Sequence, residues 1–292
     1  MSDMVCLNGR IIPRSEAMVS AFDRGFLYGD GLFETARIVA GVPFRLDRHF
    51  ARLNASCAAL GWEAAPADEG LRRAVAELIA RNGVREGYLR VTVSRGEHRG
   101  DLTLLAAEAP TVLVDAHAAD LHPLDAPPDW VLARSPWRPH RDWPLLRHKT
   151  LSYLPYVLAL SEGRRRGADE VYFVNADGHV TEGAITNLFF VRGGAVCTAA
   201  VECGLLPGIT RAAVIELCGR IGLAVREGRF GEGDLLGAEE IFCTNSLRGV
   251  VRVRRRLDGG PRDLPPGTVV PALQAAYAAL VRSECPAGRP PA

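Results

Sequence analysis

Alternating apolar and polar positions predict several strands in the first 116 residues. The expected strands form two hairpins, residues 4–12 and 33–44, and two further strands, residues 88–96 and 111–116. The hairpins turn at Asn8-Gly9 and at Gly41, residue types that favour tight turns. Helical spacing of apolar residues predicts two helices, at 47–60 and 68–82. We therefore expect a small N-terminal α/β domain over residues 1–116.

Prolines and weak periodicity set residues 117–129 apart as a linker. Beyond it, the pattern predicts hairpins at 170–183 and 186–198, strands at 240–244 and 250–254, and helices at 149–166, 208–222 and 271–282. We expect these to form a larger C-terminal domain over residues 130–284, rich in strands with flanking helices, followed by a loose tail at 285–292. The fold class is then α+β in two domains.

Composition excludes several classes of protein. With 35 basic and 34 acidic side chains in 292 residues, the chain has no general attraction for nucleic acid or acidic membranes. Its start lacks the pattern of a signal peptide, and no apolar stretch approaches the roughly 20 residues that span a bilayer. Seven scattered cysteines show no metal-ligand spacing and are expected to be reduced and buried. We expect a cytoplasmic protein without a metal site.

One basic residue differs from all the others. Of the 35 lysines and arginines, 34 are arginine, and the single lysine is Lys149. An amine can lose its proton and act as a nucleophile, which a guanidinium cannot do. Chance retention of one surface lysine explains the count equally well. The surrounding sequence, LLRHKTLSYL, favours a Schiff-base lysine, and the expected helix places Tyr153 on the same face one turn later.

A pyridoxal phosphate site requires more than a lysine. The ring nitrogen needs an anionic partner, and the phosphate needs cations and free backbone N–H groups. Glu182 closes the third predicted hairpin, and LLPGITR (205–211) is a turn that leads into a helix, where free N–H groups and the helix dipole favour an anion. Taken singly, each of these has an ordinary structural explanation, as do Arg52, Arg90 and Arg99.

Seven motifs in order change that balance, because together they resemble the class IV, fold-type IV pyridoxal-phosphate enzymes. This family includes branched-chain aminotransferases, D-amino-acid aminotransferases and aminodeoxychorismate lyases. The motifs are FDRGFLYGDGLFETARI (22–38), FRLDRHFARLNAS (44–56), YLRVTVSRG (88–96), RHKTLSYL (147–154), VTEGAITNLFFV (180–191), LLPGITR (205–211) and FCTNSLRGVVRV (242–253). The resemblance runs from about residue 7 to residue 255.

The resemblance implies a role for each matching residue. Lys149 would form the Schiff base with pyridoxal 5'-phosphate and move the proton at the substrate Cα. Glu182 would pair with the pyridine nitrogen, and Tyr153 would contact the phenolic oxygen. The implied phosphate ligands are Arg52, Ile209, Thr210 and Ser246, with Asn245 beside Ser246. The expected substrate-binding residues are Tyr28, Arg90 and Arg99. The family also implies a homodimer with a shared active site.

The reaction is less well specified than the family. Phe33-Glu34-Thr35-Ala36-Arg37 and TNSLRGVV resemble the lyases, whereas Tyr88-Leu89-Arg90 resembles branched-chain enzymes. Arg99, in SRGEHRG, resembles an R-G-x-x-x-R arrangement of D-amino-acid enzymes and lyases but is one residue closer. We expect an aminotransferase acting on an amino acid and a 2-keto acid. The alternatives are an aminodeoxychorismate lyase releasing pyruvate and 4-aminobenzoate, and a non-catalytic pyridoxal-phosphate or amino-acid binding protein.

Overall fold

A computed structural model describes residues 3–62, 66–97, 102, 110–258 and 262–286. The chain divides into two units. The first unit is formed by Met1–Leu121, His148–Tyr153 and Val281–Ala292, and the second by His122–Arg147 and Leu154–Leu280.

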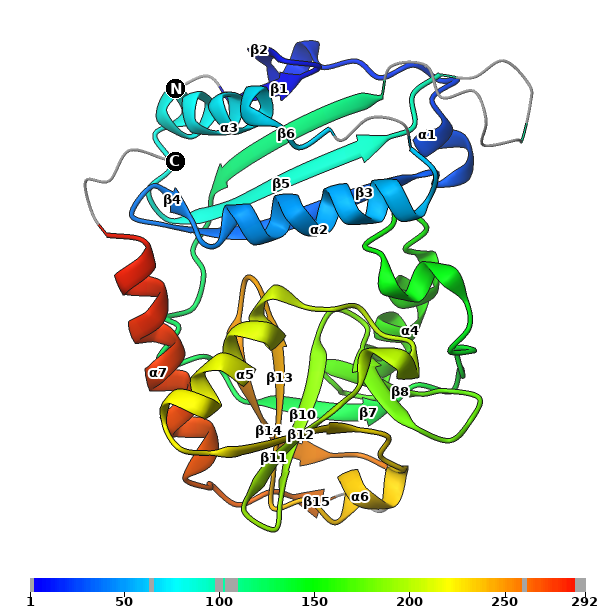
Figure 1. Ribbon diagram of the computed structural model, residues 1–292, viewed down its shortest axis with the longest axis vertical. Helices are drawn as coiled ribbons and strands as arrows, with labels where there is room; N and C mark the ends of the chain where they lie inside the picture. Colours follow the sequence, from blue (N-terminus) through cyan, green and yellow to red (C-terminus); the bar gives the residue numbers. More distant parts are fainter. Residues whose placement is uncertain (1–2, 63–65, 98–101, 103–109, 259–261, 287–292) are drawn as a thin grey trace. The chain divides into compact units, whose positions relative to one another are not determined.

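The first unit is built on a six-stranded antiparallel sheet with the strand order β2-β1-β6-β5-β3-β4 (Figure 1). Its strands are β1 (Met4–Leu7), β2 (Arg10–Pro13), β3 (Gly31–Val39), β4 (Val42–Pro43), β5 (Gly87–Ser94) and β6 (Thr111–Ala118). Positive φ angles of 50° at Asn8 and 79° at Gly9 allow the tight β1–β2 turn. Both predicted hairpins and both single strands are confirmed.

Helices cover one face of this sheet (Figure 1). They are α2 (Leu46–Ala59) and α3 (Glu69–Asn82), while the short α1 (Arg24–Tyr28) precedes β3. Asp68 caps α3 by accepting a hydrogen bond from Leu71 N at 2.8 Å, and Gly83 ends it with φ 63°. Leu53 of α2 and Leu78 of α3 are buried in the core against the sheet, so the two predicted helices are confirmed.

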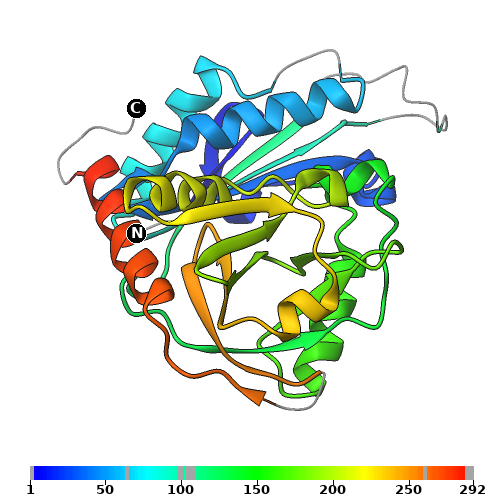
Figure 2. The same ribbon diagram turned by 60° about the horizontal axis from the view of Figure 1, so that its bottom comes forward.

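Nine strands form the sheet of the second unit, which curves back on itself (Figure 2). Because β9 pairs with both β8 and β10, the strands from β10 through β13, β14, β7 and β8 to β9 close into a barrel. The strands are β7 (Trp130–Arg134), β8 (Glu170–Val174), β9 (Val180–Gly183), β10 (Asn187–Arg192), β11 (Ala195–Ala199), β12 (Ala224–Gly228), β13 (Glu240–Asn245), β14 (Gly249–Arg256) and β15 (Arg262–Asp263).

The helices of the second unit pack around these strands (Figure 1). They are α4 (Leu154–Arg165), α5 (Ile209–Arg220), α6 (Glu232–Leu236) and α7 (Val269–Glu284), whose last residues belong to the first unit. Leu132, Leu188 and Phe190 belong to one buried hydrophobic cluster formed by these strands. Short 3₁₀ turns occur at Arg14–Glu16, Pro144–Arg147 and Val201–Cys203. The predicted hairpins, strands and last two helices of this unit are confirmed.

The predicted helix at 149–166 is wrong in its first five residues, because α4 begins only at Leu154. Residues 149–153 pair with β3 instead: Phe33 N donates to Lys149 O, and Leu151 N donates to Gly31 O, both at 2.8 Å. Pro155 is tolerated because it lies in the first turn of α4, where its missing N–H costs nothing. The pairing also places residues 148–153 in the first unit, rather than in the expected domain at 130–284.

Smaller features complete the comparison with the sequence. The strands β7, β12 and β15 and the helices α1 and α6 are additional to the predicted elements. All seven cysteines are free and buried, as expected. Cys285, in the expected loose tail, is buried, and residues 287–292 lie outside the described residues. No helix of the described chain is both long and apolar enough to cross a membrane, and its His, Cys, Asp and Glu side chains form no group suited to a metal ion.

Candidate active site

Lys149 lies in an extended segment fixed along β3. Its carbonyl oxygen accepts from Phe33 N, and the next residue, Thr150, bridges to Leu32. Gly31 permits this close approach, because a Cβ there would lie 2.5 Å from Leu151 Cδ1 and 2.6 Å from Val93 O. The backbone of the single lysine is therefore held in place by the sheet rather than by a helix.

Aromatic rings surround the side chain of Lys149. Its Nζ lies 4.3 Å from the ring centroid of Phe33 and 5.7 Å from that of Tyr153. The two rings meet edge to face with centroids 5.4 Å apart. Arg90 approaches the Phe33 ring as well, with Cζ 4.0 Å from the centroid. Phe33 thus brings together three of the predicted site residues through cation–π and ring contacts.

Arg52 is oriented by a buried carboxylate that the sequence analysis did not assign to the site. Its Nε donates to Glu34 Oε1 at 2.8 Å, and its Nη2 donates to Glu34 Oε2 at 2.6 Å. His49 Nδ1 lies 2.7 Å from the same Oε2. Burial alone would raise the pKa of Glu34, but Arg52 and His49 outweigh it and lower the pKa to about 2. The bidentate pair fixes the plane of the Arg52 guanidinium.

His49 is affected by the charges of both Arg52 and Lys149. Burial lowers the pKa of His49, and the positive charges of Arg52 and Lys149 lower it further, against the opposing effect of Glu34. His148, next to Lys149 in the chain, contacts α2 through Nδ1, which lies 3.0 Å from Ser56 Oγ. Helix α2 and the pairing of Lys149 with β3 therefore place the charges of Arg52 and Lys149 near the same histidine.

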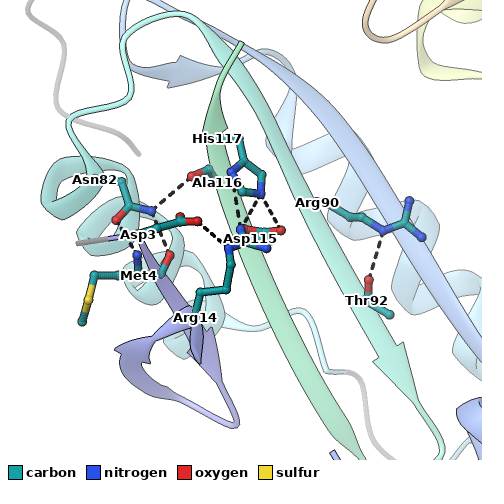
Figure 3. Close-up of polar contacts among 9 residues, drawn as sticks. All are labelled: Asp3, Met4, Arg14, Asn82, Arg90, Thr92, Asp115, Ala116 and His117. Atoms are coloured by element: carbon teal, nitrogen blue, oxygen red, sulfur yellow. Dashed lines mark hydrogen bonds and ion pairs between the residues drawn. The ribbon is translucent and has the colours of Figure 1, made fainter. Parts of the chain in front are cut away.

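The predicted substrate-binding residues have different surroundings. Arg90 Nε donates to Thr92 Oγ1 at 3.3 Å, and Figure 3 shows this pair apart from the polar cluster that contains Arg14 and Asp115. Burial lowers the pKa of the Arg90 guanidinium. Tyr28 is 52% exposed at the end of α1 and contacts the guanidinium of Arg24. Arg99 lies outside the described residues.

Glu182, at the end of β9, is a buried carboxylate of the second unit. Its Oε2 accepts from Leu206 N at 3.0 Å and from Asn187 Nδ2 at 3.2 Å. Asn187 Nδ2 also donates to Leu206 O at 2.9 Å. Glu182 is thereby tied to the loop that leads into α5, so the structure brings the predicted ring-nitrogen partner close to the predicted phosphate-binding turn.

The N-terminus of α5 has the features expected of an anion site. Gly208 is its N-cap residue without a side-chain cap, and Ile209 and Thr210 begin the helix. The first N–H groups of a helix have no intrahelical partner, and the helix dipole favours negative charge there. The predicted phosphate ligands Asn245 and Ser246 lie where β13 turns into β14, and Asn245 Oδ1 accepts from Leu247 N and Arg248 N. The side-chain oxygen of Asn245 thus stabilises the turn, and its Nδ2 is the donor group of the same amide.

Comparison with known proteins shows the family of the chain. The sequence model described as amino-transferase class IV matches residues 31–255. The chain belongs to the class IV aminotransferase family. It is 32% identical over 251 residues to the aminodeoxychorismate lyase of Bacillus subtilis (strain 168), covering 85% of each protein. It is also 32% identical over 253 residues to the D-alanine aminotransferase of Bacillus licheniformis, covering 85% of this chain and 87% of the relative.

A solved structure extends the similarity to the fold. The branched-chain aminotransferase of the thermophilic archaeon Thermoproteus uzoniensis, solved with norvaline, matches with a TM-score of 0.88 and 29% identity. The match covers 97% of this chain and 96% of that structure. The class IV chain therefore has the fold of the fold-type IV aminotransferases, as expected from its sequence. It is an enzyme of this family, whose members use pyridoxal phosphate.

The residues of each unit fit groups of that cofactor. In the first unit Lys149 supplies an amine and Arg52 a cation; in the second unit Glu182 supplies a buried carboxylate and the α5 terminus supplies N–H groups that suit a phosphate. A further observation comes from Thr244, directly before the Asn245 turn. Its buried Oγ1 has no hydrogen-bond partner among the residues that the structure describes. A buried hydroxyl of this kind suits a polar ligand, because an unsatisfied polar group is costly.

Sequence reasoning missed three residues that shape the site. Phe33 and Glu34 lie in the FETAR motif, which supported the resemblance and the comparison of reactions but gave neither residue a role, and Asn187 lies in TEGAITN, five positions after the predicted Glu182. Their contacts join residues up to 116 positions apart along the chain, as in the approach of Lys149 to Phe33. A polar residue at an expected buried strand position was the available signal, and Glu34 and Asn187 both carry it.

Proposed function

We propose that the chain is a pyridoxal-phosphate-dependent aminotransferase that moves an amino group between an amino acid and a 2-keto acid. The single observation that carries the proposal is the environment of Lys149. The backbone of the only lysine is hydrogen-bonded to β3, and its side chain lies beside the Phe33 and Tyr153 rings. Its charge lowers the pKa of His49, as the charge of Arg52 does. A lysine retained by chance on the surface would not be expected to have this environment.

The proposed chemistry assigns two tasks to Lys149. When bound, pyridoxal phosphate supplies an aldehyde that condenses with amines and a pyridine ring that accepts electrons from the substrate Cα. The Lys149 amine holds the cofactor and moves a proton at the substrate Cα. Tyr153, whose ring lies 5.7 Å from Lys149 Nζ, is proposed to donate its phenol to the phenolic oxygen of the cofactor.

Glu182 is proposed to keep a proton on the ring nitrogen. Its buried position and its hydrogen bonds from Leu206 N and Asn187 Nδ2 hold the carboxylate in one orientation. The proposed phosphate ligands are Arg52, Ile209, Thr210, Asn245 and Ser246. Their support is the fixed guanidinium of Arg52, the N–H groups at the start of α5 and the β13–β14 turn.

The substrate carboxylate is proposed to meet Arg90. Arg90 shares the Phe33 ring with Lys149, so a cation lies beside the proposed catalytic amine. Tyr28 and Arg99 remain proposed substrate contacts on the family resemblance. A lyase acting on aminodeoxychorismate is the second candidate, favoured by the FETAR motif and by the relative of that name in Bacillus subtilis.

The two reactions are separated by their need for an acceptor. The purified holoenzyme is incubated with a panel of amino acids with and without 2-keto acids, and separately with aminodeoxychorismate. An aminotransferase gives multiple turnovers only when a keto acid is present. Pyruvate released from aminodeoxychorismate without any keto acid would instead establish the lyase, and no amine transfer with any pair would refute the leading proposal.

We also propose a homodimer with a shared active site. Six large apolar side chains in residues 18–28 are exposed in the single chain, namely Met18, Val19, Phe22, Phe26, Leu27 and Tyr28. Such a patch is typical of an interaction surface. Light scattering should give twice the mass of one chain, and Phe22→Asp with Phe26→Asp should reduce it to one. A wild-type protein with the mass of one chain contradicts the dimer.

A further inference from the structure

Asn187 occupies a position shared by three segments of the proposed cofactor site. It is the first residue of β10, in register with Glu182 of β9 and with Thr244 of β13. Glu182 is the proposed partner of the ring nitrogen, and Thr244 precedes the turn of Asn245 and Ser246. Asn187 itself is 5% exposed, so its amide must find its partners within the protein.

The amide nitrogen of Asn187 closes a small hydrogen-bonded ring. It donates to Glu182 Oε2 at 3.2 Å and to Leu206 O at 2.9 Å. Leu206 N donates back to the same Glu182 Oε2 at 3.0 Å. Three hydrogen bonds therefore join the carboxylate, the amide and the backbone two residues before Gly208. In a buried setting such a closed network fixes the relative positions of its members.

The amide oxygen of Asn187 lies against Gly208. A Cβ built on Gly208, the N-cap of α5, would lie 1.9 Å from Asn187 Oδ1. The backbone of Gly208, with φ −70° and ψ 139°, is one that alanine adopts without strain. Steric contact with Asn187, and not conformational freedom, is therefore what requires glycine at this position.

We propose that Asn187 is a positioning residue that sets Glu182 relative to the N-terminus of α5. This proposal rests on the proposed function, because it concerns how the ring-nitrogen partner and the phosphate-binding turn are held as one unit. Without the amide, Glu182 Oε2 loses a donor and Leu206 O loses its partner, so the carboxylate and the turn become free to separate. Both cofactor affinity and the protonation of the ring nitrogen then change.

The test compares folded variants by their binding of pyridoxal phosphate. In Asn187→Asp the shape is kept, but the donor becomes an acceptor that faces Glu182 Oε2 and Leu206 O. In Asn187→Leu the bulk is kept and both hydrogen bonds are lost. The apoenzymes are titrated with pyridoxal phosphate, and the visible absorption band of each bound form is followed against pH. We expect affinity to fall about tenfold or more, as for a lost hydrogen bond to a charged group, and the pH at which the band changes to shift.

Asn175 provides a matched control. It is a fully buried asparagine of the same unit whose Nδ2 donates to Cys203 O at 2.9 Å and whose Oδ1 accepts from Asp177 N and His179 N. Two of these hydrogen bonds lie within the β8–β9 turn and the third joins it to Cys203, so none of them involves Glu182 or α5. Asn175→Leu should lower the melting temperature without moving the pH dependence of the band. A shift as large as in Asn187→Leu would show a general loss of stability and would refute the positioning role.

Gly208→Ala tests the same contact from the other side. The added methyl group must displace the Asn187 amide, so the affinity and the band should change in the same direction as in Asn187→Leu, even if the asparagine variants do not fold. Unchanged affinity and band in Gly208→Ala refute the proposal, as do unchanged values in folded Asn187 variants. If the wild type itself binds no pyridoxal phosphate, the proposed function fails as well, whereas a binding wild type with unaffected variants refutes only the role of Asn187.

Discussion

Glu34 in the first unit and Glu170 in the second are both buried, but their surroundings shift their pKa values in opposite directions. Glu34 lies against two potential cations, Arg52 and His49, and has a pKa of about 2. Glu170 accepts from three backbone N–H groups and from Thr186 Oγ1, all neutral, and burial raises its pKa to about 7. A formal positive charge, rather than the number of hydrogen bonds, decides the outcome.

The contrast also separates two ways of building the site. Around β3 and α2, a carboxylate is used to hold a cation, and the proposed phosphate ligand Arg52 is oriented by Glu34. Around β8 to β10, neutral donors hold the carboxylates: Glu170 organises the turn at residues 184–186, directly after Glu182 and Gly183. The first region suits an anionic ligand group, and the second suits a ligand group that carries a proton.

The largest expected effect is in the first region. Lys149→Ala removes the only side-chain amine, and loss of a catalytic base alone costs about 10²–10⁴-fold in rate. We expect kcat for amine transfer to fall by at least that factor. Lys149→Arg serves as the control, because it keeps the charge but cannot supply a neutral amine, and should be equally inactive. Activity within tenfold of the wild type in either variant would contradict the assignment.

Glu34→Gln breaks the ion pair of the first region. Removing one partner of a buried pair costs about 3–5 kcal/mol, because the remaining charge is uncompensated. Since the folded pKa of about 2 lies below the ordinary 4.5, Glu34 stabilises the protein above pH 4.5, and this contribution is lost as the pH falls toward 2. Urea unfolding at pH 7 measures the loss. Glu69→Gln, at an exposed carboxylate, should cost less than about 0.5 kcal/mol, and an equal loss in both variants would contradict the prediction.

Glu170 should show the opposite pH dependence. Its folded pKa of about 7 lies above the ordinary 4.5, so the folded protein binds the extra proton between these values. Stability therefore falls as the pH rises from about 4.5 to 7, by on the order of 3 kcal/mol at 1.4 kcal/mol per pKa unit. Glu170→Gln should remove this slope in urea unfolding, whatever its effect at any single pH. The same slope in wild type and variant would show that Glu170 stays charged.

The smallest effect is expected at Glu182. Glu182→Gln keeps the shape of the side chain but replaces a charged acceptor with a neutral one. Loss of a hydrogen bond to a charged group corresponds to about tenfold to hundredfold in kcat. Spectra of the loaded variant should show the ring nitrogen losing its proton at a lower pH than in the wild type. An unchanged pH dependence would separate Glu182 from the ring nitrogen.

Local sequence signals predicted most of the elements. The β1–β2 hairpin follows from Asn8-Gly9, and α3 follows from its apolar spacing, the Asp68 cap and Gly83. These features depend on residues close together in the chain. Residues 149–153 could not be placed in the same way. The helical pattern of the following residues continues back through them, and only β3, more than 100 positions earlier in the chain, competes for their backbone hydrogen bonds.

Only part of the candidate site could be predicted from the sequence, for the same reason. Lys149 stood out by count, the α5 N-terminus by its turn, and Tyr153 by a helical spacing that the structure does not have, because α4 begins only at Leu154. The roles of Glu182, Arg90, Arg52 and Ser246 came from resemblance. Glu34 and Asn187 act through partners on other elements, so a polar residue at an expected buried strand position was their only signal, and it did not identify those partners. The strand β12 was missed because its residues are half exposed at the sheet edge, so they lack the alternation of a half-buried strand.

The most direct test of the account is to locate the covalent bond to the cofactor. The purified protein is loaded with pyridoxal phosphate, reduced with borohydride and digested, and the modified peptide is identified by mass spectrometry. The account predicts a phosphopyridoxyl group on Lys149, in the peptide that contains HKTLSYL, and none in Lys149→Ala. A loaded protein whose label is elsewhere, or one that takes up no label, would contradict it.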